Sequence, residues 1–485
     1  MLRKIQITNN LSGKREPLVP LQENHVKMYA CGVTTYDHCH IGHAMQAIFF
    51  DVIRNYLEYA GYKVTYVRNY TDVDDKIIQR ASEQGMNPKD LADSIIKSSQ
   101  KDMEGLGIRP ATHEPKVSET IPEIIAMVEK LIELDAAYAT SSGDVYYKVQ
   151  DKKDYGKLSN RDISELRSGT RDLIEGEKKD SLDFALWKKD ETEGASWDSP
   201  WGRGRPGWHI ECSAMAKKYL GDQFDIHGGG RDLIFPHHEN EIAQSESANQ
   251  CDYAKVWIHS GLLTIDKQKM SKSLGNHISI QDFLEKWPAE VLRLAYIQQH
   301  YSSNVDFSSG FFQSCAKRLL FFYETIQNLE AFAKKASSGE ILKGYEESLV
   351  EDFHESMAKD FGTPGAIRDI LLTFKKAAEL TKEKKSANKN FTAKHYLTTL
   401  KEVSEVLGLL KQDPSSFIDE LKRKVLPSLG VTEDQIEALI EERSQARKNK
   451  DFEKSDSVRD KLEAKGIAIM DTPEGTTWTL LFSED

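Results

Sequence analysis

The sequence is poor in cysteine, and it has no long run of apolar residues. Its five cysteines among 485 residues are too few, and odd in number, for a disulfide framework. No apolar segment approaches membrane-spanning length, and no apolar stretch follows the charged start of the chain to make a secretory signal. We therefore expect a cytoplasmic protein that does not bind membranes, with reduced thiols available for packing, metal binding or nucleophilic chemistry.

The chain also lacks an excess of positive charge. Its formal net charge is −12, so bulk electrostatics attract no nucleic acid. A nucleic-acid partner must therefore be bound by local basic patches.

The length exceeds that of one ordinary domain, and the patterns change along the chain. Strand, glycine loop, helix and strand follow one another over residues 26–67, and a second strand–loop–helix block occupies residues 224–258. Residues 140–200 between the blocks look turn-rich and poor in strands. We predict an α/β fold: a Rossmann-type parallel-sheet catalytic domain split by an insertion, then an α-helical bundle and a small C-terminal α+β module. The expected divisions are 1–115 and 205–265 for the two catalytic halves, 116–204 for the insertion, 266–310 for a connecting region, 311–412 for the bundle and 430–485 for the module, with a linker beginning at Asp413.

The segment His40-Ile41-Gly42-His43 follows the first predicted strand and opens a helix. Gly42 allows close approach to the backbone, and a helix N-terminus favours phosphate. Two imidazoles three residues apart can face one ligand and donate hydrogen bonds to growing phosphate charge. Alone, the segment also fits a capped helix start with two surface histidines.

The segment Lys269-Met270-Ser271-Lys272-Ser273 precedes Leu274-Gly275-Asn276. Two lysines among serines suit a loop that neutralises polyphosphate, although a solvated basic turn has the same composition. The two segments occur in order, one with each βα block, and as a pair they resemble the two signatures of class I aminoacyl-tRNA synthetases. The resemblance implies that His40, Gly42, His43 and Lys272 bind ATP, that His40, His43, Lys269 and Lys272 are catalytic, and that Mg²⁺ accompanies the ATP. Met45 replaces a residue that is often basic in that family.

A second constellation comprises Cys31, Cys212, His237 and Glu241. His237 and Glu241 lie four residues apart after Pro236, which favours a helix start, so both would share one helix face. Two thiolates, an imidazole and a carboxylate suit zinc, but their spacing alone does not reveal a site. Buried packing cysteines, or a local cluster of Cys31, His38, Cys39 and His40, are the alternatives. Asp72, Asp74 and Asp75 fit a magnesium site less well than a loop of helix caps and salt bridges.

Four motifs spread over the catalytic region resemble those of the cysteinyl-tRNA synthetase family: Met28-Tyr29-Ala30-Cys31-Gly32, Pro206-Gly207-Trp208-His209-Ile210-Glu211-Cys212, His227-Gly228-Gly229-Gly230 and Phe235-Pro236-His237-His238-Glu239-Asn240-Glu241. The resemblance implies one Zn²⁺ held by Cys31, Cys212, His237 and Glu241, a pocket for L-cysteine formed by Thr71, Trp208, His227 and Asp232, and the partners ATP and tRNA(Cys). Each pocket residue also has an ordinary interpretation as a core or capping residue. Zinc binds a thiolate better than a hydroxyl, so the metal could separate cysteine from serine, which differ by one atom.

The C-terminal part resembles the RNA-binding region of the same family. The bundle, with Asp360-Phe361-Gly362-Thr363-Pro364, resembles its anticodon-stem bundle, although Gly362 replaces a commoner asparagine. Arg443, Arg447, Lys448 and Lys450 form a candidate phosphate patch, and Trp478 could stack on a base. A solvated helix and a core tryptophan are the alternatives.

The resemblance implies a cysteine–tRNA ligase, which we expect to act as a monomer. The alternatives are a cysteine ligase that uses the same adenylation site but acts on an amino sugar, a nucleotidyltransferase that shares only the histidine segment, and a zinc-stabilised RNA-binding protein without catalysis.

Overall fold

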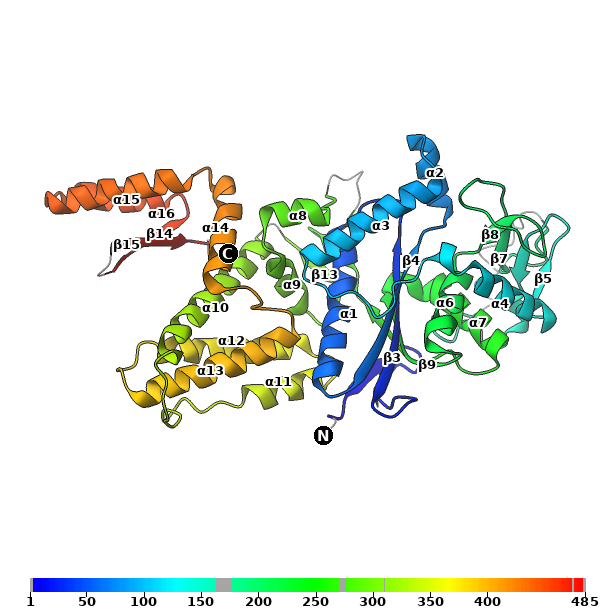
Figure 1. Ribbon diagram of the computed structural model, residues 1–485, viewed down its shortest axis with the longest axis horizontal. Coiled ribbons are helices and arrows are strands. Elements are labelled where there is room, and N and C mark those ends of the chain that lie inside the picture. Colours follow the sequence, from blue (N-terminus) through cyan, green and yellow to red (C-terminus); the bar gives the residue numbers. More distant parts are fainter. Residues whose placement is uncertain (1–2, 163–176, 271–275, 309, 473–474, 483–485) are drawn as a thin grey trace. The chain divides into compact units, whose positions relative to one another are not determined.

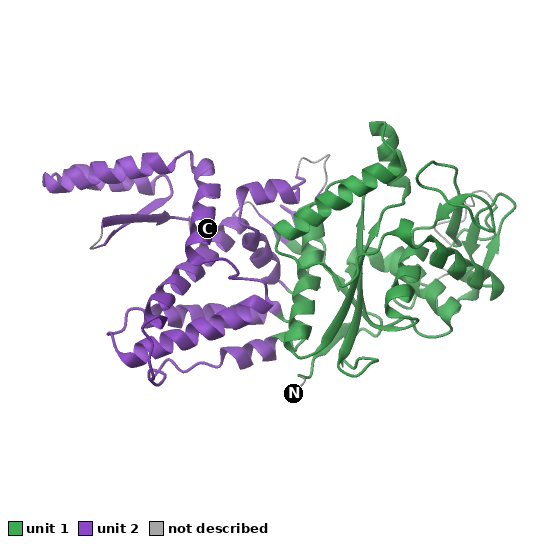
Figure 2. Cartoon of the chain, in the orientation of Figure 1, with its two compact units in different colours: residues 1–263, 300–305, 357–362 green, residues 264–299, 306–356, 363–485 purple. Residues whose placement is uncertain are grey.

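The computed structural model describes residues 3–162, 177–270, 276–308, 310–472 and 475–482. The chain forms two compact units (Figure 2). Unit 1 comprises residues 1–263, 300–305 and 357–362, and unit 2 comprises residues 264–299, 306–356 and 363–485. No described helix is both long enough and apolar enough to cross a membrane.

The centre of unit 1 is a four-stranded parallel sheet in the order β10-β9-β3-β4 (Figure 1). Its strands are β3 (His25–Thr34), β4 (Lys63–Thr71), β9 (Phe224–Gly230) and β10 (Ala254–Ser260). Tyr29 pairs with Val67 on one side and with His227 on the other, so the carboxyl ends of the three strands lie at one edge. Ligands of such sheets bind at this edge. The predicted parallel sheet, built from two βα blocks, is confirmed.

Three of the described helices of unit 1 begin with a side-chain cap. Asn87 caps α3, and Pro88 occupies its first turn. The first helix starts at Ile41 with the side chain of His40 as its N-cap, so the histidine segment opens a helix as predicted. The helices are α1 (Ile41–Tyr59), α2 (Asp75–Gln84), α3 (Pro88–Gly105), α4 (Ile121–Glu133), α6 (Ile210–Leu220) and α7 (Glu239–Asn249).

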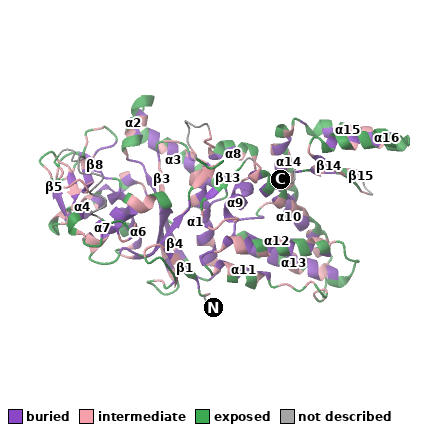
Figure 3. Cartoon of the chain, turned by 180° about the vertical axis from the view of Figure 1, so that it is seen from behind, coloured by how far each residue is buried: buried purple, intermediate pink, exposed green. Residues whose placement is uncertain are grey.

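Among the described residues of 140–200 only two short strands occur, so the prediction that this region is poor in strands is confirmed. They are the inner strands of an antiparallel sheet in the order β5-β6-β7-β8, whose outer strands lie just outside this range. Three of its strands have only three residues, too few for alternation to be recognised among turns: β5 (Ala137–Ala139), β6 (Val145–Tyr147) and β8 (Gly204–Pro206), with β7 (Phe184–Lys189) the longest. One hydrophobic core joins this sheet and α4 to the parallel sheet and α6, as the buried residues in Figure 3 indicate.

The predicted linker at Asp413 is wrong. Asp413 is the N-cap of a helix, with Pro414 in its first turn, so a cap was mistaken for a loop. Unit 2 is otherwise as helical as expected. Its helices are α8 (Ile280–Lys286), α9 (Ala289–Ile297), α10 (Phe311–Ala333), α11 (Leu349–Met357), α12 (Thr363–Leu380), α13 (Ala387–Val406), α14 (Pro414–Val425), α15 (Glu433–Lys448) and α16 (Phe452–Glu463).

Short strands complete the chain. In the C-terminal region expected to form an α+β module, the helices α15 and α16 are followed by β14 (Ile467–Thr472), which pairs with β15 (Gly475–Leu480). A small sheet combines β11 (Leu263–Ile265), β12 (Gln268–Lys269) and β13 (Val305–Phe307), and β1 (Gln6–Asn9) pairs with β2 (Lys14–Pro17).

Asp360 lies in unit 1 and not in the helical bundle where its motif was expected. Its backbone N–H donates to Gln6 O at 2.8 Å, and its carboxylate accepts from Thr8 N at 2.8 Å. Thr363, three residues later, already belongs to unit 2. The motif therefore anchors the chain beside β1 and then begins α12.

Candidate active site and metal centre

His40 and His43 cap the helix that follows β3. The His40 side chain accepts from Gly42 N at 3.1 Å, and His40 N donates to His43 Nδ1 at 3.3 Å. The two rings stack with centroids 3.8 Å apart. The predicted pair is therefore held together at a helix N-terminus, where backbone N–H groups favour an anion.

The second predicted nucleotide segment lies largely outside the described residues. Lys269 ends β12, and its backbone is opposite Thr264. Lys272 falls within residues 271–275, which the structure does not describe.

The four predicted zinc ligands converge from four elements. Cys31 comes from β3, Cys212 from α6, His237 from the short helical segment Ile234–His238, and Glu241 from α7. One ligand atom of each lies within 4.8 Å of all the others, and all four residues are buried. Cys31 Sγ lies 4.0 Å from Cys212 Sγ, and His237 Nε2 lies 3.0 Å from Glu241 Oε1. A buried cluster of soft and borderline donors is compatible with a metal site.

A second grouping shares two members of this cluster. Cys31, His227, His238 and Glu241 also offer donor atoms within 4.8 Å of one another. Cys31 Sγ is 3.3 Å from His238 Nε2, and His227 Nε2 is 2.8 Å from Glu241 Oε2. His238 is the residue that sequence reasoning missed, because it is adjacent to His237 and the motif alone does not show that both rings turn inward.

Further buried polar groups surround the cluster. His209 Nδ1 lies 2.9 Å from His237 Nδ1, Tyr253 donates its hydroxyl to Glu241 Oε2 at 3.0 Å, and His238 Nδ1 lies 2.8 Å from His259 Nε2. Such partners orient the side chains that hold a metal. His209 belongs to the motif that contains Cys212, whereas no motif of the sequence indicates that Tyr253 or His259 lies near the cluster.

Proximity of these groups shifts their pKa values. A hydrogen bond from Cys31 is the main cause that lowers the pKa of Cys212 to about 6, against the opposing effect of burial. Burial raises the pKa of the Cys31 thiol well above its usual range. Burial is the largest single effect on His237 and lowers its pKa, but the charges of Glu241 and Cys212 and the hydrogen bonds to them together raise that pKa to about 10. The close contacts therefore favour the charged forms of Cys212, His237 and Glu241 despite their burial.

The structure brings three of the four predicted pocket residues to this region. His227 bonds Glu241, and the ring of Trp208 lies 4.5 Å from that of His237. Thr71 Oγ1 donates to Glu211, the neighbour of Cys212, at 3.4 Å. Trp208 is 40% exposed, so its alternative interpretation as a core residue is wrong. Asp232 is exposed, and no described contact joins it to the cluster.

The local rival cluster does not form among the described residues. Cys39 donates to Ser99 Oγ at 3.4 Å, and His38 Nδ1 lies 2.9 Å from Ser98 Oγ. The three aspartates of the other candidate metal site have separate partners. Asp72 accepts from Ser118, Asp74 caps α2, and Asp75 pairs with Lys188 and Arg205. The interpretation as caps and salt bridges is confirmed.

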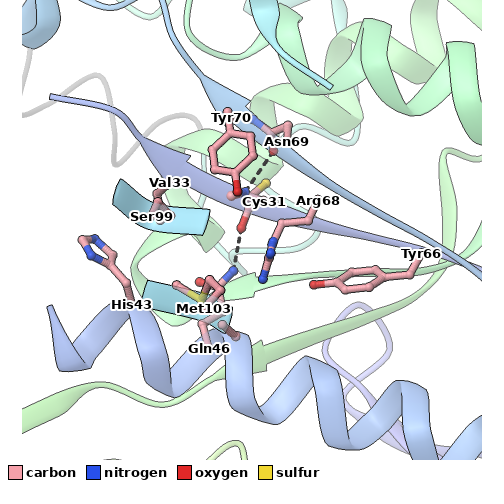
Figure 4. Close-up of a pocket in the computed structure, with 12 residues that line it drawn as sticks. Cys31, Val33, His43, Gln46, Tyr66, Arg68, Asn69, Tyr70, Ser99 and Met103 are labelled. Atoms are coloured by element: carbon pink, nitrogen blue, oxygen red, sulfur yellow. Dashed lines mark hydrogen bonds between the residues drawn. The ribbon is translucent and has the colours of Figure 1, made fainter. Parts of the chain in front are cut away.

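A cavity of about 50 Å³ adjoins the start of α1, with Cys31, His43 and Arg68 in its wall (Figure 4). Gln46 Nε2 donates to Cys31 O at 2.6 Å, and Gly32 N donates to Asn69 Oδ1 at 2.9 Å. These bonds attach the end of β3 to α1 on one side and to β4 on the other. One short segment therefore positions both Cys31 and the histidine pair.

In the C-terminal module, two residues predicted to contact RNA have other partners. Arg443 is 3% exposed and donates two hydrogen bonds to Asp471, at 2.8 and 2.9 Å, so it is not part of a surface phosphate patch. Trp478 is 8% exposed, its indole N–H donates to Glu437 at 3.1 Å, and Lys422 Nζ lies 3.8 Å from its ring centroid. Its alternative interpretation as a core residue fits this environment.

Comparison with known proteins agrees with this arrangement. The family described as tRNA synthetases class I (C) catalytic domain matches residues 17–317, and the family described as cysteinyl-tRNA ligase anticodon binding domain matches residues 431–478. The fold is also similar to that of methionyl-tRNA synthetase from Mycobacterium tuberculosis, with a TM-score of 0.58 and 15% identity over 85% of this chain and 95% of that one. The catalytic unit is therefore that of a class I aminoacyl-tRNA synthetase.

Relatives that match over almost their whole length show which family within this class the chain belongs to. The cysteine–tRNA ligases of Desulfotalea psychrophila and Geobacter metallireducens are each 45% identical to this chain, over 98% of it and 99% of their own length. The chain belongs to the cysteine–tRNA ligase family.

Proposed function

We propose that the chain activates L-cysteine with ATP to cysteinyl-adenylate and transfers the cysteinyl group to tRNA(Cys). The observation that carries the proposal is the buried cluster of Cys31, Cys212, His237 and Glu241 at the carboxyl edge of the sheet. It begins nine residues before the histidine pair of α1, on the same strand and loop. A thiol-selective group and a phosphate-binding helix start are thereby brought together.

The donor set fits one zinc ion per chain. Two sulfurs, one imidazole nitrogen and one carboxylate oxygen make a four-coordinate set of the kind that zinc prefers. We favour Cys31, Cys212, His237 and Glu241 over the grouping with His227 and His238, because two thiolates neutralise the ion and His227 is then free to orient Glu241. Bound there, zinc would supply a soft Lewis acid that binds a thiolate in preference to a hydroxyl.

The remaining residues bind and orient the reactants. Donors on His40 and His43, with the backbone at Gly42, would hold the α-phosphate region, while Lys269 and Lys272 neutralise the departing pyrophosphate with Mg²⁺. A carboxylate oxygen of cysteine attacks the α-phosphorus, and the bond to pyrophosphate breaks. A terminal ribose hydroxyl of the tRNA then attacks the acyl carbon, and AMP leaves. Positioning and charge stabilisation account for both steps, without a protein nucleophile.

The amino-acid pocket would be completed by Thr71, Trp208, His227 and Asp232. Trp208 combines an exposed ring with a contact to His237, which suits a wall that a substrate covers. Thr71 lies at the end of β4, next to Glu211. We also propose that the protein is a cytoplasmic monomer, with residues 311–412 as the anticodon-stem bundle and residues 430–485 as the anticodon-binding module.

ATP–pyrophosphate exchange across a panel of amino acids, followed by acylation of tRNA, tests the function. We expect exchange with cysteine alone, lost on chelation and restored by zinc, and then transfer to tRNA(Cys). Exchange with cysteine but transfer to an amino sugar and not to tRNA would instead identify the sugar ligase. Absence of exchange with every amino acid would contradict any activating function.

A further inference from the structure

A loop of the insertion, residues 155–161, packs against the segment that carries two of the proposed zinc ligands. This ligand segment, residues 234–241, contains His237 and Glu241. Glu239 lies between them but belongs to neither grouping of metal donors. Only 1% of Glu239 is exposed, and a carboxylate that is buried needs partners inside the protein.

Glu239 binds the insertion loop through the backbone of the loop. Its Oε1 accepts from Gly156 N at 2.9 Å. Its Oε2 accepts from Leu158 N at 3.1 Å and from Ser159 N at 2.8 Å. Hydrogen bonds to a carboxylate are stronger than those between neutral groups, so three of them attach the ligand segment firmly to the loop.

The loop is closed on itself, and it contacts the ligand segment a second time. Gly156 has a φ of 97°, and its O accepts from Arg161 N at 3.2 Å. A Cβ atom at Gly156 would lie 2.0 Å from Arg161 O, so only glycine allows this closure. The Arg161 guanidinium lies 4.3 Å from the ring centroid of Phe235. His237 is therefore placed between two points of attachment, Phe235 and Glu239.

Glu239 and Glu241 have different surroundings because they are two residues apart in α7. Side chains with this spacing do not share a helix face. Glu239 faces the insertion loop, whereas Glu241 lies 3.5 Å from Cys31 Sγ and 2.8 Å from His227 Nε2. His237 and Glu241 are each two residues from Glu239, so a shift of the backbone at Glu239 moves both ligands.

We propose that Glu239 is a positioning residue for the metal centre, which fixes His237 and Glu241 by holding the ligand segment to the insertion loop. The inference deepens the proposed function and rests on it, because this metal centre is the group that selects cysteine. It also assigns residues 155–161 of the insertion a role in amino-acid activation, since they support two ligands of the metal.

Zinc release from the full-length protein tests the inference without a catalytic step. Glu239→Gln keeps the side-chain size but turns an NH2 group towards a loop N–H, so transfer of zinc to a chelator should be about tenfold faster. Gly156→Ala should act in the same direction from the loop, with the ligand segment untouched. Glu246→Gln is the matched control, because Glu246 lies in the same helix and pairs with Lys152 and Lys157 of the insertion at 2.7 Å each. It should leave zinc release unchanged.

Proteins loaded with cobalt in place of zinc separate positioning from a general loss of stability. The visible absorption of a cobalt–thiolate site depends on its coordination geometry. Glu239→Gln should therefore alter the spectrum and Glu246→Gln should not, even where both lower the Tm. In exchange at saturating zinc, Glu239→Gln should raise KM for cysteine and leave KM for ATP unchanged. Zinc release and a cobalt spectrum equal to those of Glu246→Gln would overturn the inference and leave Glu239 a structural residue.

A milder variant keeps the test decisive. Tyr155→Phe removes only the hydroxyl that donates to Asn240 Oδ1 at 2.5 Å, so it should speed zinc release less than Glu239→Gln does. Unchanged release from both Tyr155→Phe and Gly156→Ala would overturn the inference even if Glu239→Gln failed to fold. An unsubstituted protein that retains zinc but does not activate cysteine would contradict the proposed function alone, and one that binds no zinc would contradict both.

Discussion

Replacing Gly32 with alanine should dismantle the edge of the sheet that carries the metal cluster. A Cβ atom at Gly32 would lie 1.6 Å from the backbone oxygen of Asn69, whereas real Cβ contacts are essentially never under 3.0 Å. Strands β3 and β4 would have to separate by more than an ångström beside Cys31. Asn69 also accepts from Gly32 N at 2.9 Å, so the same shift removes a hydrogen bond.

The loss of stability depends on how far the backbone around Asn69 can shift to admit the added methyl group. Overpacking costs about 1–3 kcal/mol where side chains can adjust, and a backbone carbonyl within a parallel sheet adjusts less. We expect a loss of at least about 3 kcal/mol in the free energy of unfolding, together with weaker zinc binding, because Cys31 is displaced with its strand.

Urea unfolding, zinc content and cysteine-dependent exchange would measure the effect. Gly13→Ala is the control: its Cβ meets nothing within 4 Å, so only the positive φ of 68° carries a penalty, about 1–2 kcal/mol, with zinc and exchange unchanged. Gly32→Ala protein with full zinc content and normal exchange would refute the reasoning.

Three other predictions concern the metal and the C-terminal module. Cys212→Ser should weaken zinc binding by more than about 10- to 100-fold, which is the usual loss when a residue that only hydrogen-bonds a metal ligand is removed. Undiminished zinc affinity in a competition titration would count against the assignment of Cys212 as a ligand. The pKa of Cys31 is raised well above its usual range and that of His237 is raised to about 10, so zinc must displace protons from both residues, and zinc affinity should fall as the pH drops below about 10 and more steeply below about 6, where Cys212 is protonated too; an affinity that does not change between pH 7 and pH 9 would disagree. Arg443→Met should destabilise the module by about 1–3 kcal/mol, since it breaks two bonds to Asp471, and should raise KM for tRNA while exchange stays normal; an unchanged KM would show that the module tolerates the loss.

Features defined by local chemistry could be predicted from the sequence. The segment His40 to His43 was expected to open a helix with its two imidazoles close together, and the rings of this pair do stack at the start of α1. The parallel sheet followed from two βα blocks. The pair Asp413-Pro414 could not be assigned from the local sequence, because the same residue types occur in loops and at the starts of helices.

The metal cluster could not be predicted from spacing. Cys31 and Glu241 are separated by 210 positions, and they meet because β3 pairs with β9, the strand that precedes the helix of Glu241. The family resemblance pointed to four candidate ligands, but not to the inward orientation of His238. The ion pair between Arg443 and Asp471 could not be predicted either, because its partners are also distant in the sequence. Helix periodicity places Arg443 on one face of its helix, but it does not show which residues pack against that face.

The central claim is that this cluster selects cysteine through its thiol. The most direct measurement is the ratio of kcat/KM for cysteine to that for serine in ATP–pyrophosphate exchange, with the zinc-loaded protein. The account predicts a ratio of at least about 10⁴, beyond what a neutral pocket achieves with near-isosteres. Comparable activation of serine and cysteine by the zinc-loaded protein would contradict it.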